Sequence, residues 1–152
     1  MSIDRSVSAQ IPAAPAAVRA FYVDLDNIAT LHPLVVAVER IARTVDGDGY
    51  LARYRVRDRI PMGPLVLPIS YVATLRVPVD GDVRTEARQF PRVLLRATVS
   101  FDAVTDGTRL TEELSISAPA PLLGVTVRQA VAAHTEMLAG IRRHFEEAVS
   151  PR

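Results

Sequence analysis

The chain has 152 residues, of which 49% are hydrophobic and 23% charged, with a formal net charge of +1. It is long enough to bury a core, and its near-neutral charge gives no electrostatic reason to expect a nucleic-acid partner. It contains no cysteine, which excludes disulfides, thiolate metal ligands and cysteine nucleophiles.

Nothing near the start of the chain has the character of a targeting segment. Residues 1–10 include Asp4 and Arg5 and have no long apolar run, so they do not resemble a signal peptide. No stretch approaches the roughly 20 apolar residues that a membrane span requires. We therefore expect one domain over residues 1–152, located in the cytoplasm and without stable membrane insertion.

The first part of the chain predicts a strand followed by two short helices. Residues 3–11 alternate between apolar and polar side chains, as a half-buried strand does. Apolar residues at helical spacing then predict a helix over residues 15–25. Asp26 or Asn27 can cap a second helix that ends near Leu31.

From Val35 the period of the apolar residues changes from 3.6 to 2, which predicts strands. Pro68 cannot donate to a ladder, so it must lie at an edge or a bulge. Tight turns between consecutive strands predict an antiparallel meander with one solvated face. The expected strands cover residues 35–41, 50–59, 65–77, 83–90, 92–102 and 110–117.

A long apolar stripe dominates the C-terminal region, and His134 interrupts its centre. A spacing of three or four residues over more than twenty positions predicts one long amphipathic helix with its apolar face against the core. The predicted fold class is α+β: a curved antiparallel sheet of about seven strands wrapped around this helix, with two short helices after the first strand. The stripe consists of Leu123, Val127, Val131, Leu138, Ile141 and Phe145.

This order of elements, together with several short segments, resembles the START-like helix-grip superfamily (SRPBCC), in particular its polyketide cyclase/dehydrase and lipid-transport branch. The resemblance covers nearly the whole chain and implies a deep cavity between the sheet and the long helix. The superfamily includes lipid carriers, cyclases and hormone receptors, and no invariant catalytic signature is present here, so the resemblance assigns no catalytic role. The matching segments are Phe21-Tyr22-Val23-Asp24-Leu25-Asp26-Asn27, Leu31-His32-Pro33-Leu34, Asp58-Arg59-Ile60-Pro61-Met62-Gly63-Pro64, Gly107-Thr108-Arg109-Leu110 and Arg128-Gln129-Ala130-Val131-Ala132-Ala133-His134.

Five polar side chains occupy faces that are otherwise apolar: His134, Glu112, Asp58, Tyr54 and Tyr71. A buried carboxylate without a partner is costly, so Glu112 needs a partner, a proton or water. A Glu112–His134 pair would satisfy both groups and form an acid/base couple. The alternatives are a hydrogen-bonded core histidine, a Glu112 that reaches solvent or an arginine, and an Asp58 that caps a turn or pairs with an arginine.

Further ligand contacts are expected along the helix and at the cavity mouth. Val127, Val131, Leu138 and Ile141 share the stripe with His134, and together with the five polar residues they form the candidate ligand-binding set. His32, in the loop after the second short helix, is either a gate residue or an exposed loop histidine.

We expect no metal and no cofactor. His134 and His144 are ten residues apart, which is about 15 Å along a helix, so they cannot share one ion. The segment His134-Thr135-Glu136 is similar to the first half of a zinc deaminase signature. That chemistry requires cysteine ligands, and this chain has no cysteine.

Three functions remain open from the sequence. The first is binding of a hydrophobic small molecule, such as a lipid, polyketide or isoprenoid, by a carrier or sensor. The second is a metal-free cyclase or dehydratase that uses His134 and Glu112 as its acid/base pair, with Tyr54 or Tyr71 as an oxygen donor. The third is a protein-interaction module whose cavity is filled by side chains.

Other properties are less constrained. The alternating arginines Arg53, Arg55, Arg57 and Arg59 predict a solvated sheet face, with an acidic partner or membrane headgroups as the alternative. The oligomeric state and the identity of the ligand stay open.

Overall fold

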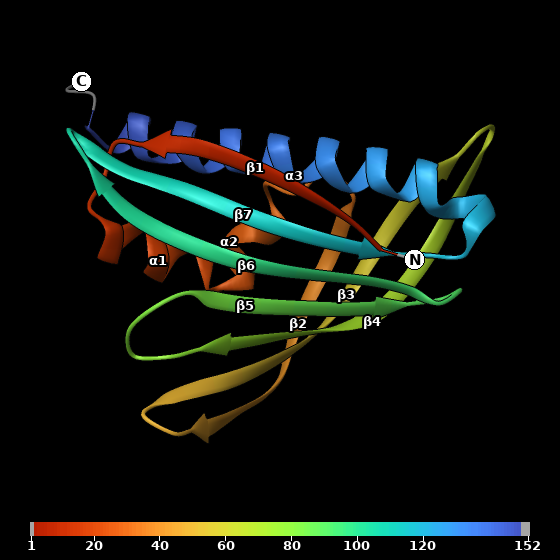
Figure 1. The fold of residues 1–152 in the computed structure, drawn as a ribbon, viewed down its shortest axis with the longest axis horizontal. Helices are drawn as coiled ribbons and strands as arrows, with labels where there is room; N and C mark the ends of the chain where they lie inside the picture. Colours follow the sequence, from red (N-terminus) through yellow and green to blue (C-terminus); the bar gives the residue numbers. More distant parts are fainter. Residues whose placement is uncertain (1, 150–152) are drawn as a thin grey trace.

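The computed structural model describes residues 2–149 as a seven-stranded antiparallel sheet that curves along one 30-residue helix (Figure 1). The strand order is β1-β7-β6-β5-β4-β3-β2. Strands β2 to β7 form a meander, and the last strand, β7, pairs with the first, β1. The predicted helix-grip architecture is therefore confirmed. Its elements are β1 (Ser2–Ile11), α1 (Pro15–Tyr22), α2 (Leu25–Ala29), β2 (Val35–Asp46), β3 (Gly49–Met62), β4 (Leu65–Val77), β5 (Val83–Gln89), β6 (Val93–Val104), β7 (Gly107–Ser117) and α3 (Ala120–Val149).

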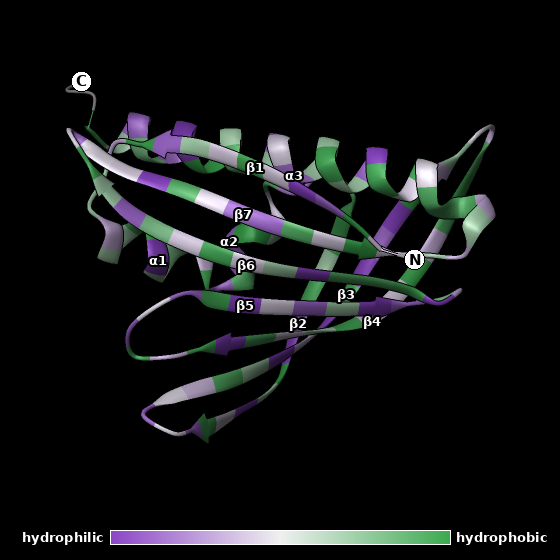
Figure 2. Ribbon diagram, in the orientation of Figure 1, coloured by the Kyte–Doolittle hydropathy of each residue, from purple (hydrophilic) through white to green (hydrophobic). Residues whose placement is uncertain are grey.

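Alternation along the strands separates a buried inner face from a solvated outer face. In β3, Tyr54, Val56 and Asp58 are buried, whereas Arg55 and Arg57 between them are exposed. Figure 2 shows the same alternation of hydrophobic and hydrophilic residues along β6 and β7. Because successive side chains of a strand point to opposite faces, this pattern brings a few polar residues into the core with their apolar neighbours.

The meander sends its turns alternately to two ends of the molecule (Figure 1). We call one end the Asp-Gly end, because its turns at residues 46–49, 80–82 and 105–107 each contain aspartate and glycine. We call the other the proline end, because its connections at residues 61–65, 90–92 and 118–121 each contain proline. Helix α3 begins at the proline end and runs along β1 and β7 towards the Asp-Gly end.

The boundary between the two short helices differs from the prediction. Asp24, not Asp26 or Asn27, caps α2: its carboxylate accepts a hydrogen bond from the Asp26 N–H at 3.1 Å. Asp24 has the extended backbone of an N-cap residue, which ends α1 before it and starts α2 after it. The Asn27 side chain instead donates to the Phe21 carbonyl.

Two features of the outer strands follow from their pairing. The register between β2 and β3 shifts twice, between Val35 and Ala37 and between Arg40 and Ala42, so β2 does not keep the regular alternation predicted for it. Strand β4 pairs with β5 only from Val72 onward, so Pro68 lies where β4 is bonded to β3 alone. The predicted edge position of Pro68 is confirmed.

No helix among residues 2–149 is long and apolar enough to cross a membrane.

Candidate ligand-binding site

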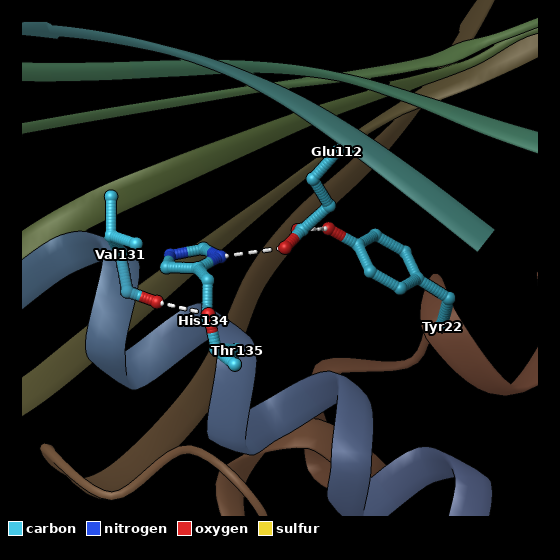
Figure 3. Close-up of polar contacts among 5 residues, drawn as sticks. All are labelled: Tyr22, Glu112, Val131, His134 and Thr135. Carbon is cyan, nitrogen blue, oxygen red and sulfur yellow. Dashed lines mark hydrogen bonds and ion pairs between the residues drawn. The ribbon is translucent and has the colours of Figure 1, made fainter. Parts of the chain in front are cut away.

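Three elements meet at a buried carboxylate, that of Glu112 on β7 (Figure 3). His134 Nδ1, from α3, lies 2.9 Å from Glu112 Oε1, and the Tyr22 hydroxyl, from α1, donates to Oε2. Glu112 is completely buried, and the His134 side chain is 13% exposed. Both carboxylate oxygens are therefore partnered, which offsets the cost of removing the charge from water.

Local structure determines which side chains enter this cluster. Glu112 follows the inward alternation of β7, between Leu110 and Leu114. Tyr22 is the last residue of α1, and its ring packs edge-on against Phe101 at 5.7 Å between centroids. Thr135, the next residue after His134, is exposed and is not part of the cluster. Its hydroxyl donates to the Val131 carbonyl of the same helix (Figure 3).

Charge and burial act in opposite directions on the His134 imidazole. Burial alone lowers its pKa, but the Glu112 carboxylate, through charge and hydrogen bond, together with the charge of Asp58, raises the pKa above the ordinary histidine value. Burial and the same carboxylate raise the pKa of the Tyr22 hydroxyl, which stays protonated. The cluster thus favours a protonated imidazole and a neutral phenol.

His32 contacts His134 but has the opposite tendency. The two rings meet edge to face, with centroids 5.3 Å apart. Burial, and then the charge of His134, lower the pKa of His32 to about 3. Its Nδ1 accepts a hydrogen bond from the Leu34 N–H, so the neutral ring carries its proton on Nε2.

Asp58 pairs with a tyrosine. The Tyr71 hydroxyl, from β4, lies 3.3 Å and 3.2 Å from the two carboxylate oxygens of Asp58 on β3. Burial raises the pKa of Asp58 to about 6, although the Tyr71 hydrogen bond and the His134 charge oppose the shift. Among residues 2–149 Asp58 forms no ion pair with arginine and no turn cap, because the β3 arginines point to the outer face.

Two adjoining pockets lie beside His134, with volumes of about 100 Å³ and 70 Å³. The first extends between α2 and strands β2 to β5 and has mainly apolar walls. The second extends towards the proline end and adds Asp58, Gln89 and Gln129. Glu112 lines neither pocket and lies behind His134. The residues shared by both pockets are His32, Tyr71, Ala87, Leu95 and His134.

The structure brings together only part of the residue set expected from the sequence. His134, His32, Tyr71 and Asp58 line the pockets, with Glu112 directly behind. Tyr54 is buried but borders a separate recess beside Asp24 and Tyr50.

Apart from His134 at its centre, the apolar stripe of α3 does not reach either pocket. Val127, Leu138 and Ile141 belong to the hydrophobic core, and Val131 packs against that core. The other pocket-lining residues of α3 lie to one side of this stripe. Thr126, Ala130 and Met137 each precede a stripe residue by one position, which is a rotation of about 100° around the helix. The side chains that border the pockets are Thr126, Gln129, Ala130, Ala133, His134 and Met137.

Two residues of the site were not in the expected set. Tyr22 is one of the residues whose helical spacing predicts the first helix, and the sequence analysis assigns it no role in the site, although a buried tyrosine hydroxyl usually requires a partner. Gln89 faces inward on β5, and its Oε1 is buried without a hydrogen-bond partner among residues 2–149. The inward alternation of Thr85, Ala87 and Gln89 was the signal in the sequence for this second residue.

No group of three or more His, Cys, Asp or Glu side chains within the described part of the chain is arranged to hold a metal ion.

The fold and this site define a helix-grip protein with a histidine–carboxylate pair beside adjoining pockets. The chain belongs to the family described as polyketide cyclase / dehydrase and lipid transport, whose family model matches residues 2–146. No curated protein sequence matches the chain.

Solved structures support the same fold at low sequence identity. The protein TTHA0849 from Thermus thermophilus is 20% identical with a TM-score of 0.74, covering 97% of this chain and 100% of that one. The Zhui aromatase/cyclase from Streptomyces sp. R1128 is 13% identical with a TM-score of 0.70, covering 99% and 100%. A START superfamily protein from Mycobacterium smegmatis is 16% identical with a TM-score of 0.60, covering 92% and 98%.

The first prediction concerns the charge of His134. Glu112→Gln removes the carboxylate that raises the pKa of this imidazole while burial remains, so the pKa of His134 should fall. Titration of the histidine C2–H resonances by NMR measures it. Glu113→Gln, the same change at the exposed neighbouring residue, is the control. An unchanged His134 titration in Glu112→Gln would contradict this account of the pair.

The second prediction concerns stability against pH. The pKa of Asp58 is raised in the folded state, so folding is favoured most while this carboxyl is protonated, and stability is lost as pH rises through about 6. Asp58→Asn removes this dependence and still accepts from Tyr71. Between pH 4 and pH 8 the parent chain should therefore lose about 1 to 3 kcal/mol more of its free energy of unfolding than Asp58→Asn does.

Urea unfolding at several pH values tests this second prediction. Asp102→Asn, on the exposed part of β6, is the matched control and should show no comparable trend. A difference between Asp58→Asn and the parent chain that stays constant with pH would show that the Asp58 carboxyl titrates normally.

Proposed function

We propose that this protein binds an apolar small molecule that carries a carbonyl or acid oxygen, and that it acts as a carrier or sensor of that molecule. The observation that carries the proposal is the position of His134, which is held by Glu112 at Nδ1 and borders both pockets. A protonated imidazole held in this way donates through Nε2. An oxygen acceptor on a ligand is the partner that such a donor requires.

The walls and volumes of the pockets limit the ligand. Apolar side chains such as Leu25, Ile28 and Met137 surround the first pocket, so burial of apolar ligand surface supplies most of the binding free energy. The volumes of about 100 Å³ and 70 Å³ are below the roughly 300 Å³ of a drug-sized site. We infer that the conformation described here accepts a single ring or a short chain.

Gln89 supplies a second point of recognition. A buried acceptor without a partner costs about 1 to 3 kcal/mol, and a ligand hydroxyl that donates to Gln89 Oε1 would recover this cost. The ligand class we propose therefore has an acceptor oxygen for His134 and a hydroxyl for Gln89. Membership of the polyketide cyclase / dehydrase and lipid transport family agrees with such a ligand.

The second candidate is a cyclase or dehydratase, which the His134–Glu112 couple beside the pockets favours. In this function the enol form of a flexible polyketone would attack one of its own carbonyl carbons. His134 would donate a proton to that carbonyl oxygen as the carbon–carbon bond closes the ring, the enol hydroxyl would lose its proton to solvent, and Glu112 would hold the imidazole in place. The aromatase/cyclase Zhui shares the fold, which makes this reaction class the relevant alternative.

Binding of three single-ring probes tests the first function. Para-hydroxyacetophenone has both oxygens, acetophenone lacks the hydroxyl, and ethylbenzene lacks both, so NMR titration should rank their affinities in that order. His134→Gln should weaken binding of both ketones about tenfold, since a hydrogen bond from a charged donor contributes about 1.5 kcal/mol or more. Gln89→Leu should abolish the preference for the hydroxylated probe.

His144→Gln provides the histidine control on the same helix, because His144 is exposed and packs against Phe21 and Phe145 away from the pockets. It should bind all three probes as the parent chain does. Failure of every probe to bind the parent chain, or equal affinities of His134→Gln and His144→Gln, would refute the proposed recognition.

Conversion of heptane-2,4,6-trione tests the second function. This triketone closes to a dihydroxytoluene with loss of one water, and it is small enough for the pockets. If the protein is a cyclase, chromatography should show product forming faster than in buffer, and His134→Gln should remove the acceleration. A rate equal to that in buffer would leave only the binding function for a substrate of this size.

A further inference from the structure

The two ends of the molecule differ in their acidic residues. The turns of the Asp-Gly end carry five aspartates, at positions 46, 48, 80, 82 and 106. The segments that build the proline end, residues 59–70, 87–95 and 118–132, contain no aspartate or glutamate at all, but four arginines. The proline end is therefore basic, whereas the aspartates of the Asp-Gly end lie beside arginines such as Arg76, which pairs with Asp46, and Arg19, which donates to the Gly81 carbonyl.

The proline end also exposes large apolar side chains. Phe90, in the β5–β6 turn, is 84% exposed, and Leu65, Val66 and Leu67, after the β3–β4 turn, are 63%, 59% and 40% exposed. Figure 1 shows both turns at the end where α3 begins. Exposed apolar side chains that gather at one end are typical of a surface that contacts something apolar, whereas a single one such as Val45 at the other end is ordinary.

These apolar tips lie on either side of the second pocket. Gln89, which precedes Phe90, and Ile60 in β3 both line that pocket. The Gln129 side chain of α3 donates to the Pro61 carbonyl at 2.6 Å and ties the helix to the β3–β4 hairpin. The hairpin, the β5–β6 turn and the start of α3 thus form one continuous surface.

Arginines surround this surface without acidic partners. Arg59, Arg92 and Arg128 are exposed and form no ion pair within residues 2–149, whereas Arg88 pairs with Glu86 at 2.8 Å. Each basic side chain near an anionic membrane contributes about 1 kcal/mol of attraction, mainly to lipid phosphates.

We propose that the proline end is a docking surface for an anionic lipid bilayer. Phe90 and residues 65–67 enter the boundary between headgroups and acyl chains, while Arg59, Arg92 and Arg128 contact phosphates. The charge argues against a symmetric dimer as the occupant, because two proline ends face to face would repel each other. Narrow turns with isolated apolar tips suit insertion into fluid lipid, where no complementary rigid surface is needed. Docking of this kind is peripheral and independent of the ligand proposed above.

Co-sedimentation with vesicles tests the proposal. The parent chain should bind vesicles of phosphatidylcholine with phosphatidylglycerol, bind vesicles of pure phosphatidylcholine at least about tenfold more weakly, and lose affinity as salt screens the arginines. Leu65→Ser combined with Phe90→Ser should reduce binding to the anionic vesicles about tenfold. Arg59→Gln combined with Arg128→Gln should reduce both the affinity and its dependence on salt.

Val45→Ser is the matched control, because Val45 is an equally exposed apolar residue, 87% exposed, beside the acidic turn at the opposite end. It should bind anionic vesicles as the parent chain does, and circular dichroism should show that all variants remain folded. The proposal would be overturned by a parent chain that binds no anionic vesicle, by equal losses in Val45→Ser and the Leu65/Phe90 variant, or by a lipid-free dimer that Phe90→Ser dissociates.

Discussion

The buried carboxylate of Glu112 is the group on which the arrangement of the site depends. It accepts hydrogen bonds from α1 through Tyr22, and it contacts α3 through His134. A carboxylate with no exposed surface is tolerated only while both oxygens have partners, so the strand, the short helix and the long helix must meet at one point. The same requirement directs the rest of the imidazole towards the pockets. Packing and chemistry are therefore coupled through one side chain.

Most of the fold was predictable from the sequence, because apolar residues recur with a period of 2 in the strands and of 3.6 in the helices, and both periods follow the buried face. Alternation in β3 and β7 placed Asp58 and Glu112 inside, and helical spacing predicted α3 around His134. The cap of α2 was not predictable, because Asp24, Asp26 and Asn27 are all good capping residues and only backbone geometry distinguishes them.

The site was less predictable, because a one-residue offset around a helix separates two adjacent stripes. The stripe that includes Val127 and Leu138 enters the core, and the stripe that includes Ala130 and Met137 borders the pockets. Sequence spacing identifies the apolar face of a helix, but it does not show which part of that face packs in the core and which part borders a pocket. By its spacing His134 belongs to the core-facing stripe, but its ring also borders both pockets, so it was predictable although the other pocket-lining residues of α3 were not. The contact between Tyr22 and Glu112 is tertiary and no local pattern contains it, whereas alternation along β5 indicates only that Gln89 faces inward and not that it reaches a pocket.

The edges of the sheet have a consequence for self-association. Strand order leaves β2 at one edge, where unpaired N–H and C=O groups can recruit a strand of another molecule. Two register shifts interrupt β2, and the charged Glu39, Arg40 and Arg43 lie along it. Bulges and charges of this kind prevent a flat, continuous edge from forming. The opposite edge, β1, lies alongside α3. The irregularity that made β2 hard to predict thus protects the protein against edge-to-edge aggregation.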